Sequence, residues 1–402
     1  MMPQKAAGTL ALPWDTKGSR GAPRVGMDQV LLWVTVMLAI VGLIMVFSAS
    51  AVLAGNRYHD SWYYLKRQCV WLVVGLSLLH VLSRIDYVWW KRVSLPLLGG
   101  MTTLLAMVLI PSLGIAANGA RRWLGVGPIS IQPAEMLKLG LVIYLAAYLT
   151  KKERRIQDFQ TGLLPALLVV GFLSGLVLME PDLGTVVVLG LVTGSLLFVG
   201  GASLSHLSTL VLCAVPIGLA LVLSTEYRRQ RLMAFLQPWN DASDTGFQIT
   251  QSFLAFGSGG LFGVGLGEGK QKLYFLPEAH TDFVLALIGE ELGFVGTGVI
   301  ILLFVLFMIR GFQISTRARV PFGRYLGIGI TTLIGVQALI NACVVTGLVP
   351  TKGLTLPFVS YGGSSLVVSL AGVGMLLSIS RDRHAGRGEM EHRSGHGWAR
   401  DR

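Results

Sequence analysis

The sequence contains few charged residues. Asp, Glu, Lys and Arg make up 13% of its 402 residues, and hydrophobic residues make up 53%. An average soluble domain has about 25% charged residues, so this chain has about half the usual charge. Its apolar surface must therefore face something other than water. This excludes an ordinary soluble protein and predicts a membrane protein.

Cysteine is also scarce, and the common catalytic motifs are absent. Cys69, Cys213 and Cys343 lie in apolar stretches without CxxC spacing, which excludes a disulfide framework and a structural zinc site. The sequence has neither a GxSxG nucleophile elbow nor an HExxH zinc helix. Residues 263–270 resemble a phosphate loop only superficially, because they lack its spacing and the Ser or Thr that follows it.

Long apolar stretches recur along the whole chain, separated by short breaks rich in charge, proline or glycine. A helix needs about 20 mainly apolar residues to cross a bilayer. The last stretch contains Pro357 and is expected to be partly re-entrant. The pattern predicts an all-α polytopic membrane protein, in contact with membrane lipid, whose ten transmembrane helices cover residues 30–53, 68–83, 93–111, 134–150, 163–179, 183–201, 205–224, 283–309, 325–347 and 358–379.

The distribution of positive charge predicts that both termini lie in the cytoplasm. Most of the 33 Lys and Arg residues fall in the tails or in three short loops, and short loops rich in these residues stay cytoplasmic. The same bias accounts for the net charge of +12 without a folded basic domain, so no nucleic-acid partner is predicted. Residues 28–380 form one transmembrane domain, and the polar tails, residues 1–27 and 381–402, are predicted to be disordered.

One connection is much longer than the others. Residues 225–281 lie outside the membrane in this topology, on the face opposite the termini. Loops of this length are usually functional or disordered. This loop carries many aromatic residues among its polar ones, so we expect short amphipathic helices that lie on the outer membrane surface.

Charged residues within or beside membrane helices are costly, so each is a candidate for a functional site. Glu135 and Lys138 lie three residues apart on one helix and are expected to pair, either in a functional cavity or as a purely structural ion pair. Glu180 and Asp182 lie in a tight turn, where capping of the next helix is an alternative role for Asp182. Asp282 lies where the long loop meets a helix, and capping is its alternative role too.

Two further groups of charged residues flank these candidates. Glu290 and Glu291 lie deeper in the same helix as Asp282 and are expected to be buried, hydrogen-bonded packing residues. Basic residues on the outer face suit phosphate oxygens, although snorkelling at the membrane surface also explains them. The strongest candidates for binding a pyrophosphate are Arg121, Arg122, Arg228 and Lys352. Carboxylates and basic groups on one face of a bilayer suit a lipid-linked anionic substrate.

Several runs of residues resemble the SEDS family of shape, elongation, division and sporulation proteins. The resemblance covers residues 28–380 in order, and it is strongest to the cell-division members. The matching runs are Phe47-Ser-Ala-Ser50, Gln132-Pro-Ala-Glu-Met-Leu-Lys138, Pro181-Asp-Leu-Gly-Thr185, residues 271–283, Gly289-Glu-Glu-Leu-Gly293 and residues 350–365, with Tyr227-Arg-Arg-Gln-Arg231 and Ala234-Phe-Leu-Gln-Pro-Trp239 as the cues for division.

The resemblance implies a peptidoglycan glycosyltransferase that polymerises lipid II into β-1,4 glycan strands. It would act at the outer face of the cytoplasmic (inner) membrane, at the division septum. Asp282 matches the essential aspartate of the family and is predicted to be the catalytic base. Glu135, Lys138 and Asp182 match its supporting residues. The fourth, fifth, sixth and eighth spans are expected to surround one outward-facing cavity that holds these side chains.

Cofactors and partners follow from the same resemblance. A divalent cation, Mg²⁺ or Mn²⁺, that bridges Asp282 or Asp182 to phosphate oxygens is an open alternative to the basic residues. The chain lacks a transpeptidase domain, so a class B penicillin-binding protein and other divisome proteins are expected as partners. Two competing functions are a lipid II flippase, which needs essential charge along a path to the cytoplasmic face, and a non-catalytic divisome scaffold, which would tolerate loss of Asp282.

Overall fold

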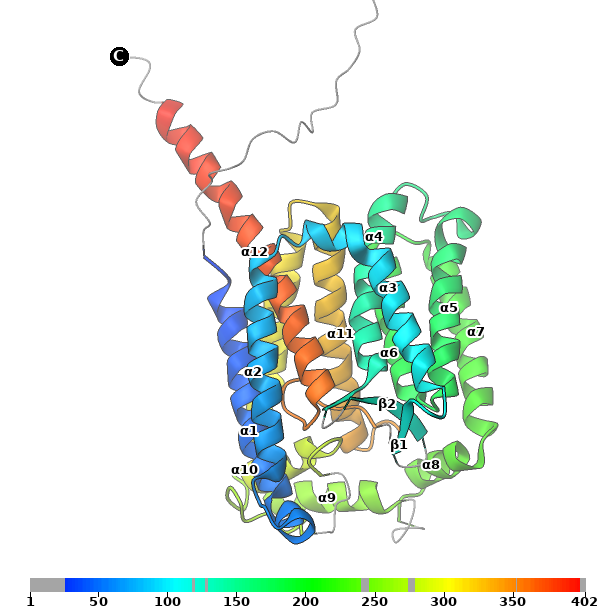
Figure 1. The fold of residues 1–402 in the computed structure, drawn as a ribbon, viewed down its shortest axis with the longest axis vertical. Coiled ribbons are helices and arrows are strands. Elements are labelled where there is room, and N and C mark those ends of the chain that lie inside the picture. Colours follow the sequence, from blue (N-terminus) through cyan, green and yellow to red (C-terminus); the bar gives the residue numbers. More distant parts are fainter. Residues whose placement is uncertain are drawn as a thin grey trace, which may run out of the picture.

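The ten apolar stretches fold into ten helices that stand side by side (Figure 1). The computed structural model describes residues 26–117, 120–126, 129–239, 246–273, 279–351 and 353–397. Within these ranges, eight helices are long and apolar enough to cross a membrane, and α6 is a shorter apolar helix. The bundle consists of α1 (Gln29–Tyr58), α2 (Tyr63–Arg84), α3 (Val88–Val108), α4 (Pro133–Lys152), α5 (Leu164–Met179), α6 (Leu183–Val199), α7 (Leu204–Leu223), α10 (Val284–Thr316), α11 (Pro321–Val345) and α12 (Gly363–Gly397). The protein is therefore a polytopic α-helical membrane protein.

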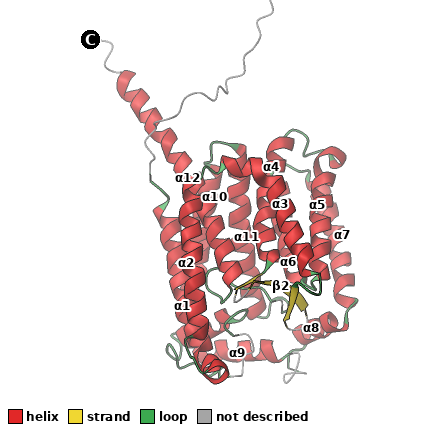
Figure 2. Cartoon of the chain, in the orientation of Figure 1, coloured by secondary structure: helices red, strands yellow, loops and turns green. Residues whose placement is uncertain are grey.

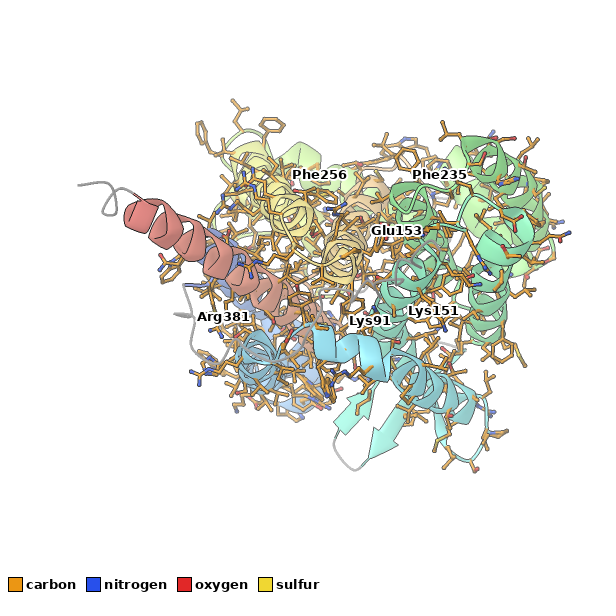
Figure 3. All side chains as sticks on the ribbon, turned by 90° about the horizontal axis from the view of Figure 1, so that it is seen from above. Lys91, Lys151, Glu153, Phe235, Phe256 and Arg381 are labelled. Atoms are coloured by element: carbon orange, nitrogen blue, oxygen red, sulfur yellow. The ribbon has the colours of Figure 1, made fainter. Side chains whose placement is uncertain are left out.

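The two ends of the bundle differ. The beginning of α1 and the end of α12 lie at the same end, the upper one in Figure 1, as an even number of crossings requires. Figure 3 looks at this end from above and labels Lys91, Lys151 and Arg381, which belong to the predicted cytoplasmic set. All the strands and the two short helices lie toward the opposite, lower end (Figure 2).

The lower end contains a small sheet that the sequence reading did not predict. Strands β1 (Gly114–Ala117), β2 (Ala120–Val126) and β3 (Ile129–Ile131) form an antiparallel sheet in the order β1-β2-β3. Leu124 pairs with both Gly114 and Ile131. The dipeptide Asn118-Gly119 between two apolar runs is a typical hairpin signal, and it could have indicated this sheet.

The long loop contains the expected short helices, α8 (Glu226–Leu236) and α9 (Phe247–Gly259). After α9 the chain forms a loop, residues 260–273, that packs against α10. There α10 is broken at Gly293, whose φ of 69° and ψ of −165° are not helical. The predicted span over residues 283–309 is therefore present as α10, with a break at Gly293 that its apolar pattern did not indicate.

The 260–273 loop supplies hydrogen bonds at this break. The backbone N–H groups of Val264 and Gly265 donate to the carbonyls of Glu290 (3.0 Å) and Glu291 (3.1 Å), and the N–H of Phe294 donates to the carbonyl of Gly260 (2.9 Å). Backbone groups freed inside a membrane bundle need such partners. The hydrogen bonds from the loop thus stabilise the break in α10.

The last span is also interrupted. Helix α12 begins only at Gly363, and the residues before it, here called the 353–362 segment, are largely not helical although Leu354, Phe358 and Val359 are buried. A Cβ atom on Gly42 would lie 2.5 Å from the carbonyl oxygen of Phe358, so this segment lies directly against α1. A non-helical segment enclosed by protein agrees with the expected re-entrant character.

The predicted tails meet the structure only in part. Residues 1–25 lie outside the described residues. Helix α12 continues to Gly397, whereas composition predicted no fixed structure for residues 381–402. The other predicted helix ends differ from the observed ones by only a few residues.

Burial identifies the centre and the edge of the bundle. In the most apolar 18-residue stretches of α4, α11 and α12, 72%, 72% and 83% of the residues are buried. In α7, which the structure describes completely, no residue is buried. Polar residues of α4, α11 and α12, such as Glu135, Lys138, Gln337 and Ser369, are therefore enclosed by protein.

Two glycines near the end of α9 give a matched test of this packing. A Cβ atom on Gly259 would collide with the carbonyl oxygen of Gly289 in α10, whereas a Cβ atom on Gly257 meets nothing. We expect Gly257→Ala to leave stability unchanged or to raise it by about 0.5–1 kcal/mol, through helix propensity. Gly259→Ala should lower it by about 1–3 kcal/mol, because the helices must move apart. Thermal unfolding of the detergent-purified variants measures both, and equal effects would contradict the close contact.

Candidate functional site

Asp282 lies immediately before α10, in a position fixed from several sides. Its side chain is half-buried. The N-cap position of α10 is occupied by Phe283, so the capping alternative is not supported. The side-chain amide of Asn341 in α11 donates to the backbone carbonyl of Asp282 (2.8 Å). A Cβ atom on Gly353 would lie 3.0 Å from Asp282 Oδ2, so the carboxylate faces the 353–362 segment.

Aromatic rings hold the chain just before Asp282. The His280 ring lies against Tyr64 of α2 and Tyr361, with centroid distances of 4.8 Å and 5.6 Å. The N–H of Tyr361 donates to the carbonyl of His280 (2.9 Å). Asp282 is therefore tied to α2, α11 and the 353–362 segment.

Asp182 caps α6, as the alternative reading proposed. Its carboxylate accepts hydrogen bonds from the backbone N–H (3.0 Å) and the hydroxyl (2.8 Å) of Thr185. A Cβ atom on the next-but-one residue, Gly184, would lie 3.2 Å from the side chain of Leu354. The first turn of α6 therefore lies beside the same 353–362 segment that faces Asp282.

Glu180, in the same turn, is in an unusual environment. It is fully buried, and its carboxylate oxygens receive no hydrogen bond from any residue that the structure describes. Burial, assisted by the nearby Asp182 and opposed by Arg122, raises the pKa of Glu180 to about 8. Glu180 is therefore mainly protonated at neutral pH, and no feature of the sequence indicated this difference from Asp182.

Glu135 and Lys138 form the expected ion pair, with 2.8 Å between Lys138 Nζ and Glu135 Oε1. Both side chains are buried and border a small cavity. The cavity is lined by residues of α4, α11 and α12, including Gln337 and Ser369. The side-chain nitrogen of Gln337 is buried and has no acceptor within the described part of the chain.

This small cavity lies between α4, α11 and α12, and Asp182 and Asp282 do not line it. The larger outward-facing cavity between the fourth, fifth, sixth and eighth spans stays a prediction. The sequence pattern could indicate which residues share one helix, but not which distant helices pack around them.

The predicted pyrophosphate ligands differ in their exposure and in the hydrogen bonds that they already make. Arg122 in β2 donates to the carbonyls of Glu180 (3.0 Å) and Pro181 (2.7 Å), so it already supports the turn before α6. Arg228 donates to the carbonyl of Leu221 in α7 (3.0 Å). Arg121, also in β2, is exposed, and Lys352 lies outside the described residues. Their role as phosphate ligands stays a prediction.

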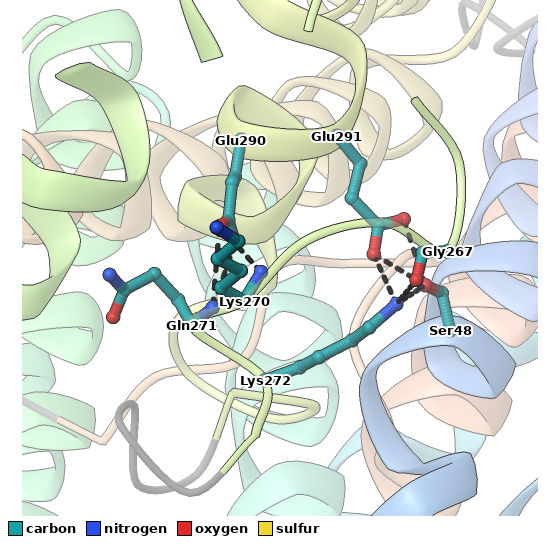
Figure 4. A network of polar contacts seen from close by, with 7 residues as sticks. All are labelled: Ser48, Gly267, Lys270, Gln271, Lys272, Glu290 and Glu291. Atoms are coloured by element: carbon teal, nitrogen blue, oxygen red, sulfur yellow. Dashed lines mark hydrogen bonds and ion pairs between the residues drawn. The ribbon is translucent and has the colours of Figure 1, made fainter. Parts of the chain in front are cut away.

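Glu290 and Glu291 are buried and hydrogen-bonded, as expected. The Glu291 carboxylate accepts from the Ser48 hydroxyl of α1 (2.6 Å) and forms an ion pair with Lys272 (2.8 Å), while Glu290 accepts from the N–H of Lys270 (2.7 Å) (Figure 4). These contacts fasten the end of the 260–273 loop to α1 and α10. They stabilise the chain that leads to Asp282.

The donor set for a metal is small. Across the residues that the structure describes, no group of three or more His, Cys, Asp or Glu residues converges. Mg²⁺ nevertheless needs only one or two carboxylates when substrate phosphates complete its coordination. Asp182 is already engaged by Thr185 through both oxygens, so it could bind an ion only by giving up part of its cap on α6.

The buried pair of Lys272 and Glu291 predicts a large effect on stability. Glu291→Met leaves the Lys272 ammonium buried without its partner, which costs about 3 kcal/mol or more. The double variant with Lys272→Met should recover most of this loss, because no unpaired charge remains. The exposed pair of Glu226 and Arg229 is the control, and Glu226→Gln should cost at most about 1 kcal/mol. Thermal unfolding that finds the double variant no more stable than Glu291→Met contradicts this account.

Glu180 predicts a pH-dependent stability. An unfolded Glu ionises near pH 4.5, whereas Glu180 keeps its proton in the folded protein up to about pH 8. The folded state thus binds more protons between these values, and stability must fall as the pH rises from 4.5 to 8. Glu180→Gln cannot ionise and should melt at least about 2 °C higher than the wild type at pH 8, with no such gain at pH 4.5. Parallel melting curves at both pH values would show that Glu180 is ordinarily ionised.

Comparisons with known proteins identify the family of this chain. Residues 29–385 match the family of cell cycle proteins named for FtsW, RodA and SpoVE. A probable peptidoglycan glycosyltransferase FtsW of Geobacter sulfurreducens is 47% identical over 353 residues, covering 88% of this chain and 95% of the relative. The stage V sporulation protein E of Bacillus subtilis is 43% identical over 354 residues, 88% of this chain and 97% of the relative.

Solved structures show the same fold. A chain from a peptidoglycan synthase complex, described as coordinating polymerization and crosslinking, superposes with a TM-score of 0.72 at 29% identity, covering 90% of this chain and 99% of its own length. The rod shape determining protein RodA of Thermus thermophilus superposes with a TM-score of 0.64 at 29% identity, covering 90% and 98%. The chain therefore belongs to the FtsW, RodA and SpoVE family of cell cycle proteins.

Proposed function

We propose that this protein is a peptidoglycan glycosyltransferase that polymerises lipid II into β-1,4 glycan strands during cell division. The observation that carries the proposal is the placement of Asp282, a half-buried carboxylate held by α2, α11 and the 353–362 segment at the start of α10. Relatives at 47% identity bear the name of this activity. A membrane bundle also suits a substrate whose lipid tail remains in the bilayer.

The reaction joins two lipid-linked sugars. The 4-hydroxyl of one sugar attacks the anomeric carbon of the other, the bond to undecaprenyl pyrophosphate breaks, and the hydroxyl proton must go to a base. Asp282 is the proposed base, because its carboxylate faces Gly353 and the N-cap position of α10 belongs to Phe283. One direct displacement inverts the α-linked donor to a β-linked product and needs no covalent enzyme intermediate.

The leaving pyrophosphate needs positive charge. Fixed cations at the position where charge develops stabilise a transition state strongly. The exposed Arg121 in β2 and the neighbouring Arg122 are the described residues best suited to this role, with Arg228 and Lys352 as further candidates. The buried pair of Glu135 and Lys138 supports the bundle behind the site, because Lys138 is only 1% exposed.

A divalent cation is a further part of the proposal. It would bind Asp282 and the substrate pyrophosphate together, since the described residues provide too few ligands for a complete protein site. Its contribution would be to neutralise charge on the leaving group.

The partner and the location extend the same proposal. A chain of similar fold belongs to a peptidoglycan synthase complex that couples polymerization and crosslinking. We propose an equivalent assembly here, with a class B penicillin-binding protein supplying the crosslinking, located with other divisome proteins at the septum. The termini would lie in the cytoplasm and the sheet, α8 and α9 on the outer face.

Loss of the Asp282 carboxylate tests the assignment. Asp282→Ala and Asp282→Asn, purified with the transpeptidase partner, should make glycan strands from lipid II at least about 100-fold more slowly than the wild type, as expected when a base is removed. Glu226→Ala is the matched control, because Glu226 is an exposed carboxylate in α8 and should leave the rate unchanged.

The same assay distinguishes the competing functions. Glycan strands are scored by gel, and movement of fluorescent lipid II across vesicles is scored in parallel. Near-normal polymerisation by the Asp282→Ala variant would show that Asp282 is not the base. Translocation without polymerisation by the wild type would favour a flippase, and neither activity would favour a scaffold.

Removal of divalent cations tests the metal. Chelation should slow the wild type at least about 10-fold, and Mg²⁺ or Mn²⁺ should restore the rate, if the ion neutralises the pyrophosphate. Polymerisation at full rate in the presence of the chelator would show that the basic residues, and not a metal ion, neutralise the pyrophosphate.

A further inference from the structure

Asn341 is a buried amide in the centre of the bundle. It lies near the end of α11 and is 1% exposed. Its side-chain nitrogen donates two hydrogen bonds, one to the backbone carbonyl of Asp282 (2.8 Å) and one to that of Leu354 (2.7 Å). The two carbonyls belong to segments more than 70 residues apart in the sequence. One amide group therefore joins two separate loops.

This arrangement uses the full donor capacity of the amide. An Asn side chain has two N–H donors, and both are directed at the loops. Its oxygen is also buried, and no donor in the described ranges reaches it. A buried polar atom without a partner costs about 1–3 kcal/mol, so the position is expensive for a residue that only fills space. An apolar side chain of similar size would avoid that cost but would leave both carbonyls unpaired.

The two carbonyls define where the Asp282 carboxylate lies. The first belongs to Asp282 itself, so the hydrogen bond limits rotation of the backbone that carries the carboxylate. The second belongs to Leu354, whose neighbour Gly353 lies so near that a Cβ atom there would be 3.0 Å from Asp282 Oδ2. Asn341 thus holds both the residue and the backbone that the carboxylate faces.

We propose that Asn341 is a positioning residue for glycosyl transfer, which sets the distance between the Asp282 carboxylate and the 353–362 segment. It acts through Asp282 and does not touch the substrate. The inference rests on the proposed function, in which Asp282 is the base. A displacement of about 1 Å at a reacting group can cost about 100-fold in rate, so a residue outside the site can matter as much as one inside it.

The test replaces the amide and compares kinetic constants for lipid II polymerisation, with the partner present. Asn341→Leu and the isosteric Asn341→Asp remove the paired donors. We expect kcat per folded molecule to fall about 10- to 100-fold while KM changes less than about 2-fold, because positioning of a base is felt in the transition state. Thr331→Val is the matched control: Thr331 is equally buried in α11, but its hydroxyl donates to the carbonyl of Gly327 in the same helix (2.8 Å) and not to either loop.

Hydrogen exchange separates positioning from general destabilisation. Asn341→Leu should speed amide exchange in residues 279–284 and 353–356 together, and Thr331→Val should speed neither. Gly353→Ala gives an independent approach, because its methyl group presses on Asp282 Oδ2 while Asn341 stays intact. If both changes displace the same carboxylate, the loss in kcat for the double variant is smaller than the product of the two single losses.

The outcomes are distinct. A folded Asn341 variant with wild-type kcat overturns the inference, as does a loss that combines multiplicatively with Gly353→Ala or exchange that rises throughout α11. If neither Asn341 variant folds, a wild-type kcat in Gly353→Ala overturns it. A wild-type protein that makes no glycan, or an active Asp282→Ala variant, refutes the proposed function instead.

Discussion

Backbone groups inside a membrane must find partners within the protein, and this constraint governs the structure wherever the chain leaves a helix. It does so at the break at Gly293, at the turn before α6 and along the 353–362 segment. The 260–273 loop hydrogen-bonds the backbone at Gly293, and the guanidinium of Arg122 donates to the carbonyls of the turn before α6. The amide of Asn341 donates to one carbonyl of the 353–362 segment. A charged residue such as Arg122, which the sequence suggests as a ligand for substrate, can thus serve as a hydrogen-bond donor to the backbone.

These irregular segments meet one another. The first turn of α6, which follows the turn at Glu180 and Pro181, lies beside Leu354, and the 353–362 segment faces Asp282 and receives the Asn341 amide. The carboxylate proposed to act as the base therefore lies where several non-helical segments are cross-connected. Preorganisation of this kind is what a base needs, because a fixed group loses little freedom when the reaction proceeds.

The sequence predicted the local features and missed the distant ones. The ten helices follow from runs of apolar residues, and the contacts of Glu135 with Lys138 and of Asp182 with Thr185 follow from spacing along one helix. The cavity walls of α11 and α12, the break at Gly293 and the bonds of Asn341 depend on residues far apart in the chain. The pattern of charged residues within the spans does not point to Asn341, which is neutral. A buried amide within a span also indicates a hydrogen-bonding role.

The most direct test of the central claim is a structure of the protein with its partner and an unreactive lipid II analogue bound. The account predicts the acceptor 4-hydroxyl within about 3 Å of an Asp282 carboxylate oxygen, which is the distance for proton transfer to a base. It also predicts the pyrophosphate beside the sheet that carries Arg121 and Arg122. Sugars bound beyond reach of Asp282, or at the end of the bundle where α1 begins, would contradict it.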